Sequence, residues 1–306
     1  MMMKYRFLKQ YPKIFKKMTG LSVKEFDSLY DDVLPMYKEA EEKRLDRAER
    51  ERGLGGGRKA TLSLRDQVLL TVIWLRLYPT QDVLGYFFGV SQSAVSHYID
   101  HALPVLEQAG RDTMRLPDPG RKRRPGLSKL LEEMPEIMVV IDSFEQKVQR
   151  PLNKDKQKSY YSGKKKQHTL KSQVAVDELT GMVVDVSDSV PGPTADMKLL
   201  EHSGLLDRLP DGVGGMGDLA YTGLEKLHPL CAAPRRKPRG QERPPQDVLY
   251  NTAFSQRRII VENSIGRMRR YQSILQADRH HRQLHTARVL AIAGLVNRQI
   301  GHRLVH

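Results

Sequence analysis

The sequence contains little cysteine and no long apolar run. Its one cysteine, Cys231, cannot form a disulfide within the chain, and no cluster of Cys and His has the spacing of a zinc site. No stretch approaches the roughly 18 apolar residues that a membrane-spanning helix needs. The first residues are basic but lack the apolar segment of a signal peptide. We therefore expect a reducing, intracellular setting, with Cys231 as an ordinary small apolar residue.

Acidic residues are too few to balance the basic ones. The chain has 51 Lys and Arg against 36 Asp and Glu, which gives a formal charge of +15 and a pI near 9.8. Such an excess favours a polyanionic partner, nucleic acid first and an acidic membrane surface second. The length of 306 residues allows two domains, one of them with a sizeable core.

Residues 1–57 are expected to form a helical N-terminal region that ends in a hinge. Ser22 and Glu25 fit a capping box at the start of a helix. The glycine run at 53–57 then breaks the chain, and Arg58 and Lys59 follow it. These two cations either lie along a phosphate backbone or belong to a simple linker, and the sequence leaves both interpretations open.

Residues 58–110 have the pattern of a helix-turn-helix DNA-binding domain. We expect helices over 62–77, 80–88 and 91–108, with a glycine turn between the last two. The pattern also fits a plain three-helix packing unit. In a DNA-binding domain, the first turn of the third helix would face the groove with short polar side chains. These residues are Ser91, Gln92, Ser93, Ser96 and His97.

Two further groups of cations are candidates for phosphate contacts. A basic linker is predicted over 111–135, where Arg121, Lys122, Arg123 and Arg124 stand side by side. Lys164, Lys165 and Lys166 belong to a second basic segment. Four adjacent cations such as 121–124 usually form a solvated loop, but the strong positive charge of the chain supports a phosphate contact at least as well.

Carboxylates follow two predicted strands. An apolar run over 137–141 predicts a buried strand with Asp142 at its C-terminal end. A hairpin over 169–187 comes next, and then a short glycine-rich strand that ends in Asp218. If the two strands ending in Asp are neighbours in one sheet, their carboxylates converge at its edge.

A third acid, Glu262, lies on a helix predicted over 251–270. Arg258 precedes it by one turn and Arg269 follows it by about two, so these cations could orient the acids or hold DNA. Alone, Glu262 also fits a surface ion pair. Hard oxygen ligands at a sheet edge suit Mg²⁺ or Mn²⁺, and two such ions about 3.5–4 Å apart would promote an in-line displacement at phosphorus.

Together these motifs resemble the Asp-Asp-Glu transposases of the Harbinger type and their bacterial insertion-sequence relatives. The resemblance covers about residues 60–300 and rests on Val-Ile-Asp142-Ser, Gly-Asp218-Leu-Ala-Tyr and Arg258-x-x-x-Glu262-Asn. It implies the α+β class, with an RNase H-like mixed-sheet catalytic domain over 136–306 after the all-helical helix-turn-helix region. Asp142, Asp218 and Glu262 would then be the catalytic ligands of two Mg²⁺ or Mn²⁺ ions.

The resemblance also implies an activity and partners. The enzyme would bind the terminal inverted repeats of its element, hydrolyse DNA there and join the freed 3′-OH ends to target DNA. It would act as a homo-oligomer on double-stranded DNA, in the bacterial cytoplasm at the nucleoid and away from membranes. Two alternatives remain: a domesticated DNA-binding regulator that no longer cuts, and an RNase H-like nuclease without transposition.

Three positions depart from the family's pattern. Ser255 stands where bacterial relatives have Tyr, and Arg269 stands where they have Lys. Ala195 replaces a His that often precedes Asp196. Asp196 could support the metal-binding residues or cap a helix over 195–206, and we favour the cap. None of these changes removes a predicted metal ligand.

Overall fold

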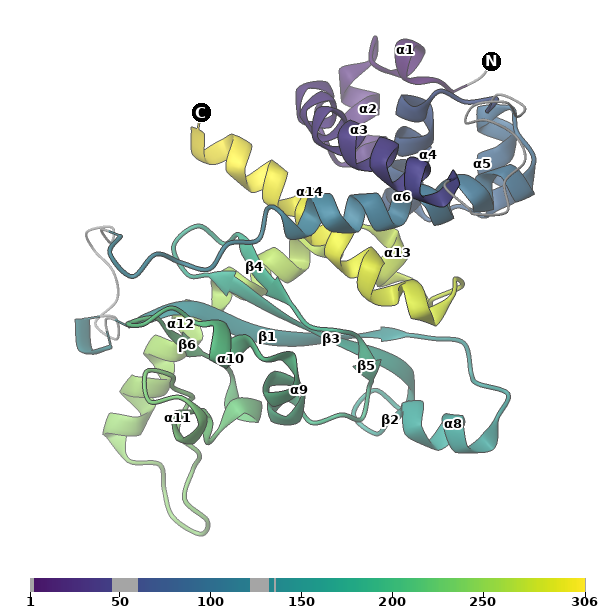
Figure 1. Ribbon diagram of the computed structural model, residues 1–306. Coiled ribbons are helices and arrows are strands. Elements are labelled where there is room, and N and C mark those ends of the chain that lie inside the picture. Colours follow the sequence, from purple (N-terminus) through teal and green to yellow (C-terminus); the bar gives the residue numbers. More distant parts are fainter. Residues whose placement is uncertain (1–2, 46–59, 122–131, 135, 306) are drawn as a thin grey trace.

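The computed structural model describes residues 3–45, 60–121, 132–134 and 136–305 (Figure 1). N-terminal helices lie on one side and a mixed sheet on the other, and the long C-terminal helix α14 (His285–Val305) runs between them. This arrangement confirms the α+β class, with helices first and the sheet after. Five predicted DNA contacts lie outside the described residues and stay predictions: Arg58, Lys59, Lys122, Arg123 and Arg124.

Three helices precede the predicted helix-turn-helix. They are α1 (Tyr5–Leu8), α2 (Pro12–Thr19) and α3 (Val23–Leu45). The capping box before α3 is confirmed: Ser22 Oγ accepts from the N–H of Glu25 at 3.2 Å, and Glu25 Oε2 accepts from the N–H of Ser22 at 2.6 Å. These reciprocal bonds satisfy groups that the start of a helix leaves without partners, so the start of α3 is fixed by local sequence.

The helix-turn-helix region consists of α4 (Leu64–Leu77), α5 (Gln81–Phe88) and α6 (Gln92–Arg111), as predicted. Tyr78 ends α4 in the left-handed conformation, with φ at 52°, directly before Pro79. A Cβ atom on Gly85 would lie 2.6 Å from the carbonyl oxygen of Val90. Only glycine therefore allows α5 to approach the turn before α6 this closely.

A six-stranded mixed sheet forms the base of the second half. Its strands are β1 (Ile137–Lys147), β2 (Tyr161–Ser162), β3 (Gln167–Asp177), β4 (Val183–Val186), β5 (Val190–Pro191) and β6 (Gly214–Met216). Strand β3 pairs antiparallel with β1, β2, β4 and β5, while β6 pairs parallel with β1. The predicted hairpin is therefore confirmed as β3 and β4. The predicted neighbouring strands are β1 and β6.

Strand β1 is longer than predicted, and the expectation that it ends at Asp142 is wrong. Asp142 lies in the middle of the strand opposite Val174, and pairing with β3 continues to Lys147. Beyond Asp142 the strand alternates, because Phe144 and Gln146 are buried between less buried neighbours. The ladder with β3 supplies the backbone partners that keep this polar segment extended.

Helices flank the sheet. They are α8 (Lys154–Tyr160), α9 (Asp196–Ser203), α10 (Leu205–Arg208), η1 (Leu219–Tyr221), α11 (Leu224–Leu227), α12 (Pro245–Met268), α13 (Gln272–Leu275) and η2 (Arg282–Leu284). The predicted single helix over 195–206 is wrong, because Gly204 takes φ at +63° and separates α9 from α10. On α12, Phe254 and Val261 are buried, whereas Ile259 is 53% exposed.

One apolar cluster joins the N-terminal helices to the sheet through α14. Five apolar residues of α14 are buried in this cluster: Val289, Leu290, Ile292, Leu295 and Val296. Helices α6 and α14 cross at two glycines, and a Cβ on Gly294 would lie 2.3 Å from Gly110 Cα. The helix that carries the predicted recognition residues is thus anchored at its other end on α14. None of the helices in the described ranges is long and apolar enough to cross a bilayer.

Candidate active site

Asp142 and Asp218 come together through the parallel pairing of β1 with β6. Val140 faces Met216 in this pair, and each aspartate follows two residues later on its own chain segment. The carboxylate of Asp142 accepts the N–H of Ser143 at 2.8 Å and is 18% exposed. The carboxylate of Asp218 accepts the N–H of Ala220 at 2.8 Å and caps η1. The pairing therefore brings both acids to the same region, with Asp142 inside β1 and Asp218 two residues beyond the end of β6, where the predicted strand was expected to include it.

Arg258 connects the third acid to this pair. Helix α12 packs on β1, and Arg258 Nη2 lies 3.6 Å from Asp142 Oδ2 and 3.2 Å from Glu262 Oε1. Glu262 is 55% exposed, so it stands at the open side of the site. Within the described part of the chain, no three His, Cys, Asp or Glu side chains are grouped closely enough to hold a metal ion together. The acids share one neighbourhood, with a guanidinium between two of them.

The three acids act on one another electrostatically. Burial raises the pKa of Asp142 above its ordinary value, and the charges of Asp218 and Glu262 raise it further. The N–H of Ser143 and the guanidinium of Arg258 oppose this rise. A half-buried carboxylate repelled by two others is stabilised by any additional cation. The site therefore has the electrostatic character of a cation-binding site.

A buried polar group supports β1 behind Asp142. Asp196 Oδ1 accepts a hydrogen bond from Ser143 Oγ at 2.7 Å and pairs with Lys171 Nζ at 2.9 Å. The expectation that Asp196 caps α9 is wrong: Ala195 occupies the cap position, and no side-chain cap bond forms there. The reason is that Ser143 and the buried Lys171 offer the carboxylate stronger partners than the first turn of α9 does.

Sequence reasoning missed two members of this neighbourhood. Ser143 follows Asp142 directly, and Tyr221 closes the Gly-Asp-Leu-Ala-Tyr motif. Burial raises the pKa of Tyr221 well above its ordinary value, and Asp196, Asp142 and Asp218 add to the rise. The Tyr221 hydroxyl donates to Gln173 Oε1 on β3 at 3.1 Å. The motif was visible in the sequence, but its tyrosine had no predicted partner.

The predicted recognition residues lie at the free end of α6. Ser91 caps the helix, with its Oγ accepting the N–H of Ala94 at 3.2 Å. Gln92, Ser93 and His97 are exposed, and Ser96 is half-buried. Gln92 donates a side-chain hydrogen bond to Gln81 of α5. The region therefore presents a polar helix start to solvent, although Ser91 also has a structural role.

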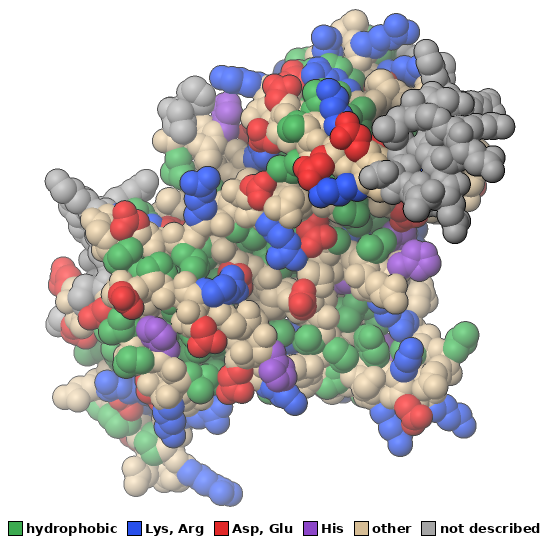
Figure 2. Space-filling model, in the orientation of Figure 1, with side chains coloured by type: hydrophobic (Ala, Val, Ile, Leu, Met, Phe, Trp, Pro, Cys, Tyr) green, Lys and Arg blue, Asp and Glu red, His purple; other side chains and the backbone are tan. Residues whose placement is uncertain are grey.

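The predicted cations outside this helix have different surroundings. Lys164, Lys165 and Lys166 are exposed in the turn before β3. Arg269 is exposed and lies 5.7 Å from the ring of Phe144. On the face seen in Figure 2, Lys and Arg side chains are spread among Asp and Glu. The positive charge is not gathered into one patch on this face.

The predicted phosphate contact of Arg121 stays a prediction, and the structure gives this side chain acidic partners within the protein. Its guanidinium is paired with Asp177 at the end of β3 and lies 3.7 Å from Glu178, and its side chain is only 17% exposed. The sequence could not show this, because the partners lie 56 residues away along the chain. Arg121 thus stabilises the turn between β3 and β4.

Comparison with known proteins identifies relatives for both halves of the chain. The family model of the DDE superfamily endonucleases matches residues 141–297, about half of the chain. The model of the helix-turn-helix of these endonucleases matches residues 60–112. The two matched regions contain the predicted catalytic acids and the predicted recognition residues, respectively.

Two curated proteins are similar over most of their length. A protein of Microchaete diplosiphon named "Probable transposase for insertion sequence element IS702" is 28% identical over 288 residues, 94% of each chain. A protein of Streptomyces albus G named "Putative transposase for insertion sequence element IS112" is 26% identical over 246 residues, which are 78% of this chain and 84% of that protein. No solved structure matches the chain significantly.

Proposed function

Because the chain belongs to the DDE superfamily endonucleases, we propose that it is an insertion-sequence transposase that binds the terminal inverted repeats of its element, cleaves the DNA there and joins the 3′-OH ends to target DNA. The observation that carries the proposal is the pairing of β1 with β6, in which Val140 faces Met216, so that Asp142 within β1 and Asp218 just after β6 each follow this pair by two residues. Helix α12 adds Glu262 through Arg258. Both curated relatives are named as transposases for insertion sequences.

Two divalent cations, Mg²⁺ or Mn²⁺, belong to this proposal. The donor set fits them in kind, because carboxylate oxygens are the ligands these ions prefer, although within the described residues the three acids are not grouped closely enough to hold one ion together. Burial raises the pKa of Asp142, and the charges of Asp218 and Glu262 raise it further, so a nearby cation would stabilise its charged form. Asp142, Asp218 and Glu262 would hold the ions. When bound, such ions activate a water nucleophile and stabilise the leaving oxygen at phosphorus.

The chain's own residues perform the remaining tasks. Ser143, Asp196 and Lys171 fix the backbone of β1 at Asp142, so the carboxylate is presented in one orientation. Arg258 holds Glu262 beside Asp142 and offers a cation for the DNA backbone. The free end of α6 would bind the element ends through base edges, and the exposed Lys164–Lys166 turn would contact phosphates. We expect this enzyme to act as a homo-oligomer in the bacterial cytoplasm.

Cleavage of duplex DNA that carries the sequence flanking the gene tests the proposal. With Mg²⁺ present, we expect Asp142→Asn to lower the rate of strand cleavage by on the order of 10⁴-fold. Asp207→Asn, which removes an exposed carboxylate on α10, is the matched control and should cleave like the parent. Equal cleavage by Asp142→Asn and the parent would overturn the assignment of this site.

The same assay separates the alternatives. A parent protein that binds the ends in a salt-dependent way but never cuts them would be a regulator that keeps the fold. A parent that cuts but does not join 3′ ends to a second duplex would be a nuclease without transposition. Detection of joined products on a sequencing gel distinguishes the transposase from both.

A further inference from the structure

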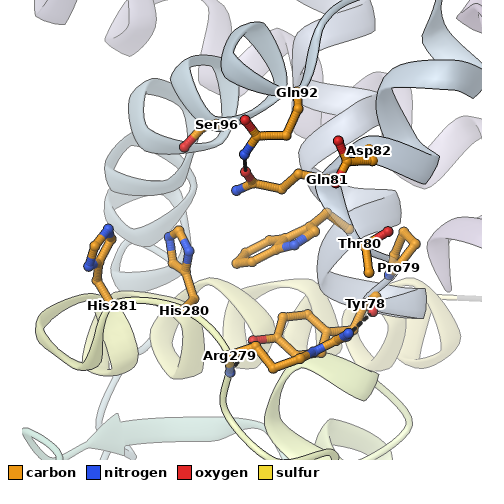
Figure 3. A pocket seen from close by; sticks show the side chains of 11 residues that line it. Tyr78, Pro79, Thr80, Gln81, Asp82, Gln92, Ser96, Arg279, His280 and His281 are labelled. Carbon is orange, nitrogen blue, oxygen red and sulfur yellow. Dashed lines mark hydrogen bonds between the residues drawn. The ribbon is translucent and has the colours of Figure 1, made fainter.

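A cavity of about 400 Å³ opens between the helix-turn-helix and the segment that leads from α13 to α14 (Figure 3). We name it the junction pocket. Gln92 and Ser96 of α6 line one side, and Arg279, His280 and His281 line the other. The same recognition-helix end that would meet DNA therefore shares a pocket with residues more than 180 positions later in the chain.

His280, which lines this pocket, carries a ring nitrogen without a hydrogen-bond partner among the described residues. Its side chain is 9% exposed, and within the described structure its Nε2 atom makes no hydrogen bond. An Asp100 carboxylate oxygen lies 3.7 Å from Nε2, which is within the range of an ion pair with a protonated imidazole but too long for a hydrogen bond. The imidazole is held at its place by the ring of Trp74, 5.1 Å between centroids. A buried polar atom left without a partner is costly, so it marks a place for a polar ligand.

Arg279 brings a positive charge that no carboxylate neutralises among the described residues. Its guanidinium lies 4.4 Å from the centre of the Tyr78 ring and donates to the carbonyl of Tyr78. The neighbouring carboxylate of Asp278 is already committed to Arg288. Arg279 is exposed, as is His281 beside it. The contacts with Tyr78 therefore hold the Arg279 guanidinium at the pocket, and its charge can still pair with an anion.

The helix α5 adds backbone donors to the same pocket. Thr80 stands at its N-cap without a side-chain cap bond, and Thr80, Gln81 and Asp82 all line the cavity. The first N–H groups of a helix without a side-chain cap favour an anion near them. Asp82 is the one acidic side chain of the lining and lies in this first turn, where the helix dipole stabilises it.

We propose that the junction pocket binds a backbone phosphate of the duplex that α6 recognises, with Arg279, His280 and the start of α5 as its donors. The inference rests on the proposed DNA-binding function and deepens it: the segment between α13 and α14 becomes part of the DNA-binding surface. A phosphate next to the first turn of α6 fits the way such contacts fix the register of a recognition helix.

Salt-dependent binding tests the contribution of Arg279. The probe is a fluorescent duplex of the gene's flanking DNA, measured by anisotropy in EDTA so that cleavage plays no part. Arg279→Gln should lower affinity several-fold and reduce the slope of log K against log salt by about 0.9, the value for one lost phosphate contact. Arg279→Lys should restore the slope. Lys226→Gln, on the distant α11 (Figure 1), is the matched control and should leave it unchanged.

A scan with methylphosphonates identifies the phosphate itself. Replacing the contacted phosphate by a neutral methylphosphonate should weaken binding to the parent but not further weaken Arg279→Gln. His280→Phe keeps the ring against Trp74 and removes Nε2, so it should weaken binding at this same phosphate with the slope unchanged, while thermal unfolding confirms that the variant folds.

Two results would overturn the inference. One is an unchanged slope for Arg279→Gln with no methylphosphonate position coupled to it. The other is an unchanged affinity of His280→Phe for the duplex, which would mean that Nε2 makes no contact with the DNA. Neither result bears on cleavage by Asp142, because binding is measured without metal. Conversely, equal cleavage by Asp142→Asn would leave these binding differences intact.

Discussion

Two arginine–aspartate contacts in this molecule have opposite designs. Arg288 and Asp278 meet through two parallel hydrogen bonds of 2.7 Å, and their side chains are 0% and 1% exposed. Arg258 instead lies 3.6 Å from Asp142 and 3.2 Å from Glu262, with its side chain 25% exposed. The first pair is closed and bidentate. The second is open, shared between two acids and incompletely bonded.

The difference separates a structural ion pair from a candidate site. Arg288 and Asp278 are joined by the Tyr78 hydroxyl, 3.3 Å from Asp278 Oδ1, so the cluster ties α4 to the C-terminal region. Both carboxylate oxygens of Asp278 accept hydrogen bonds from Arg288, so neither is available to a ligand. Arg258 keeps its acids near one another without saturating them, so a ligand can compete for the same oxygens.

The largest loss of stability is expected at the closed pair. Asp278→Asn leaves a fully buried guanidinium without its charge partner, and breaking such a pair costs about 3–5 kcal/mol. Urea unfolding followed by circular dichroism measures the change. The double variant Asp278→Leu/Arg288→Met, which removes both charges, should recover much of the loss. A loss below about 1 kcal/mol for Asp278→Asn would contradict the structural role.

Acid should lower the free energy of unfolding, because His285 is buried next to the pair of Arg288 and Asp278. Burial, with the charge of Arg288, lowers the pKa of His285 to about 3 from 6.5. Its ring nitrogens lie 2.7 Å from Ser189 Oγ and 2.8 Å from Gln146 Oε1. As pH falls below 6.5, His285 becomes protonated in the unfolded chain but stays neutral in the folded chain. Stability should therefore fall by up to about 1.4 kcal/mol per pH unit until pH approaches 3.

Unfolding of the parent and of His285→Gln across this pH range provides the measurement. The variant should be less stable at neutral pH, because a buried hydrogen bond is altered. Its stability should nevertheless depend less on pH than that of the parent. Parallel curves for the two proteins would show that His285 is not the group responsible.

At Asp142 the dependence of stability on pH should have the opposite sign to that at His285, so that acid stabilises the folded state. The pKa of Asp142 is raised, so above that pKa the folded state holds a carboxylate that burial and two acids disfavour. This penalty is relieved as pH falls through the raised pKa. Asp142→Asn removes it at neutral pH and should stabilise the metal-free protein by about 0.5–2 kcal/mol, as expected where function and stability conflict. A destabilised Asp142→Asn variant would show that the carboxylate has a structural role.

The smallest change in stability is expected for Arg258→Gln. Exposed or half-exposed ion pairs contribute about 0–1 kcal/mol, so the unfolding free energy should hardly change. DNA cleavage should nevertheless fall, because Glu262 is no longer held beside Asp142. Arg44→Gln, which removes an exposed pair with Glu41 on α3, is the stability control. A large loss of stability would show that Arg258 has a structural role like that of Arg288.

Local sequence determined much of the fold and the candidate acids. The capping box at Ser22, the glycine at 85 and the proline at 79 act within a few residues, so their effects were visible in the chain. The acids could be found because each follows or occupies a strongly patterned element. Their spacing and sequence contexts carried the resemblance to the family.

Features that depend on distant partners could not be predicted. Strand β1 continues past Asp142 because β3 supplies its ladder, and nothing in the polar segment itself requires that. Asp196 looked like a cap until the fold supplied Ser143 and Lys171. The pairing of Arg121 with Asp177 joins residues that lie far apart in the sequence. Charged side chains take their role from whatever the tertiary structure brings near, and one-dimensional patterns carry little of this.

The crossing at Gly110 and Gly294 has a consequence for changes in chain length. Helix α6 carries recognition residues at its start and the glycine crossing near its end. One residue inserted between them would rotate the start of the helix by about 100° relative to its anchor and shift it by about 1.5 Å. Insertions and deletions are therefore excluded from this segment even where any single substitution is accepted. Exchange of recognition helices between relatives should succeed only between helices of equal length.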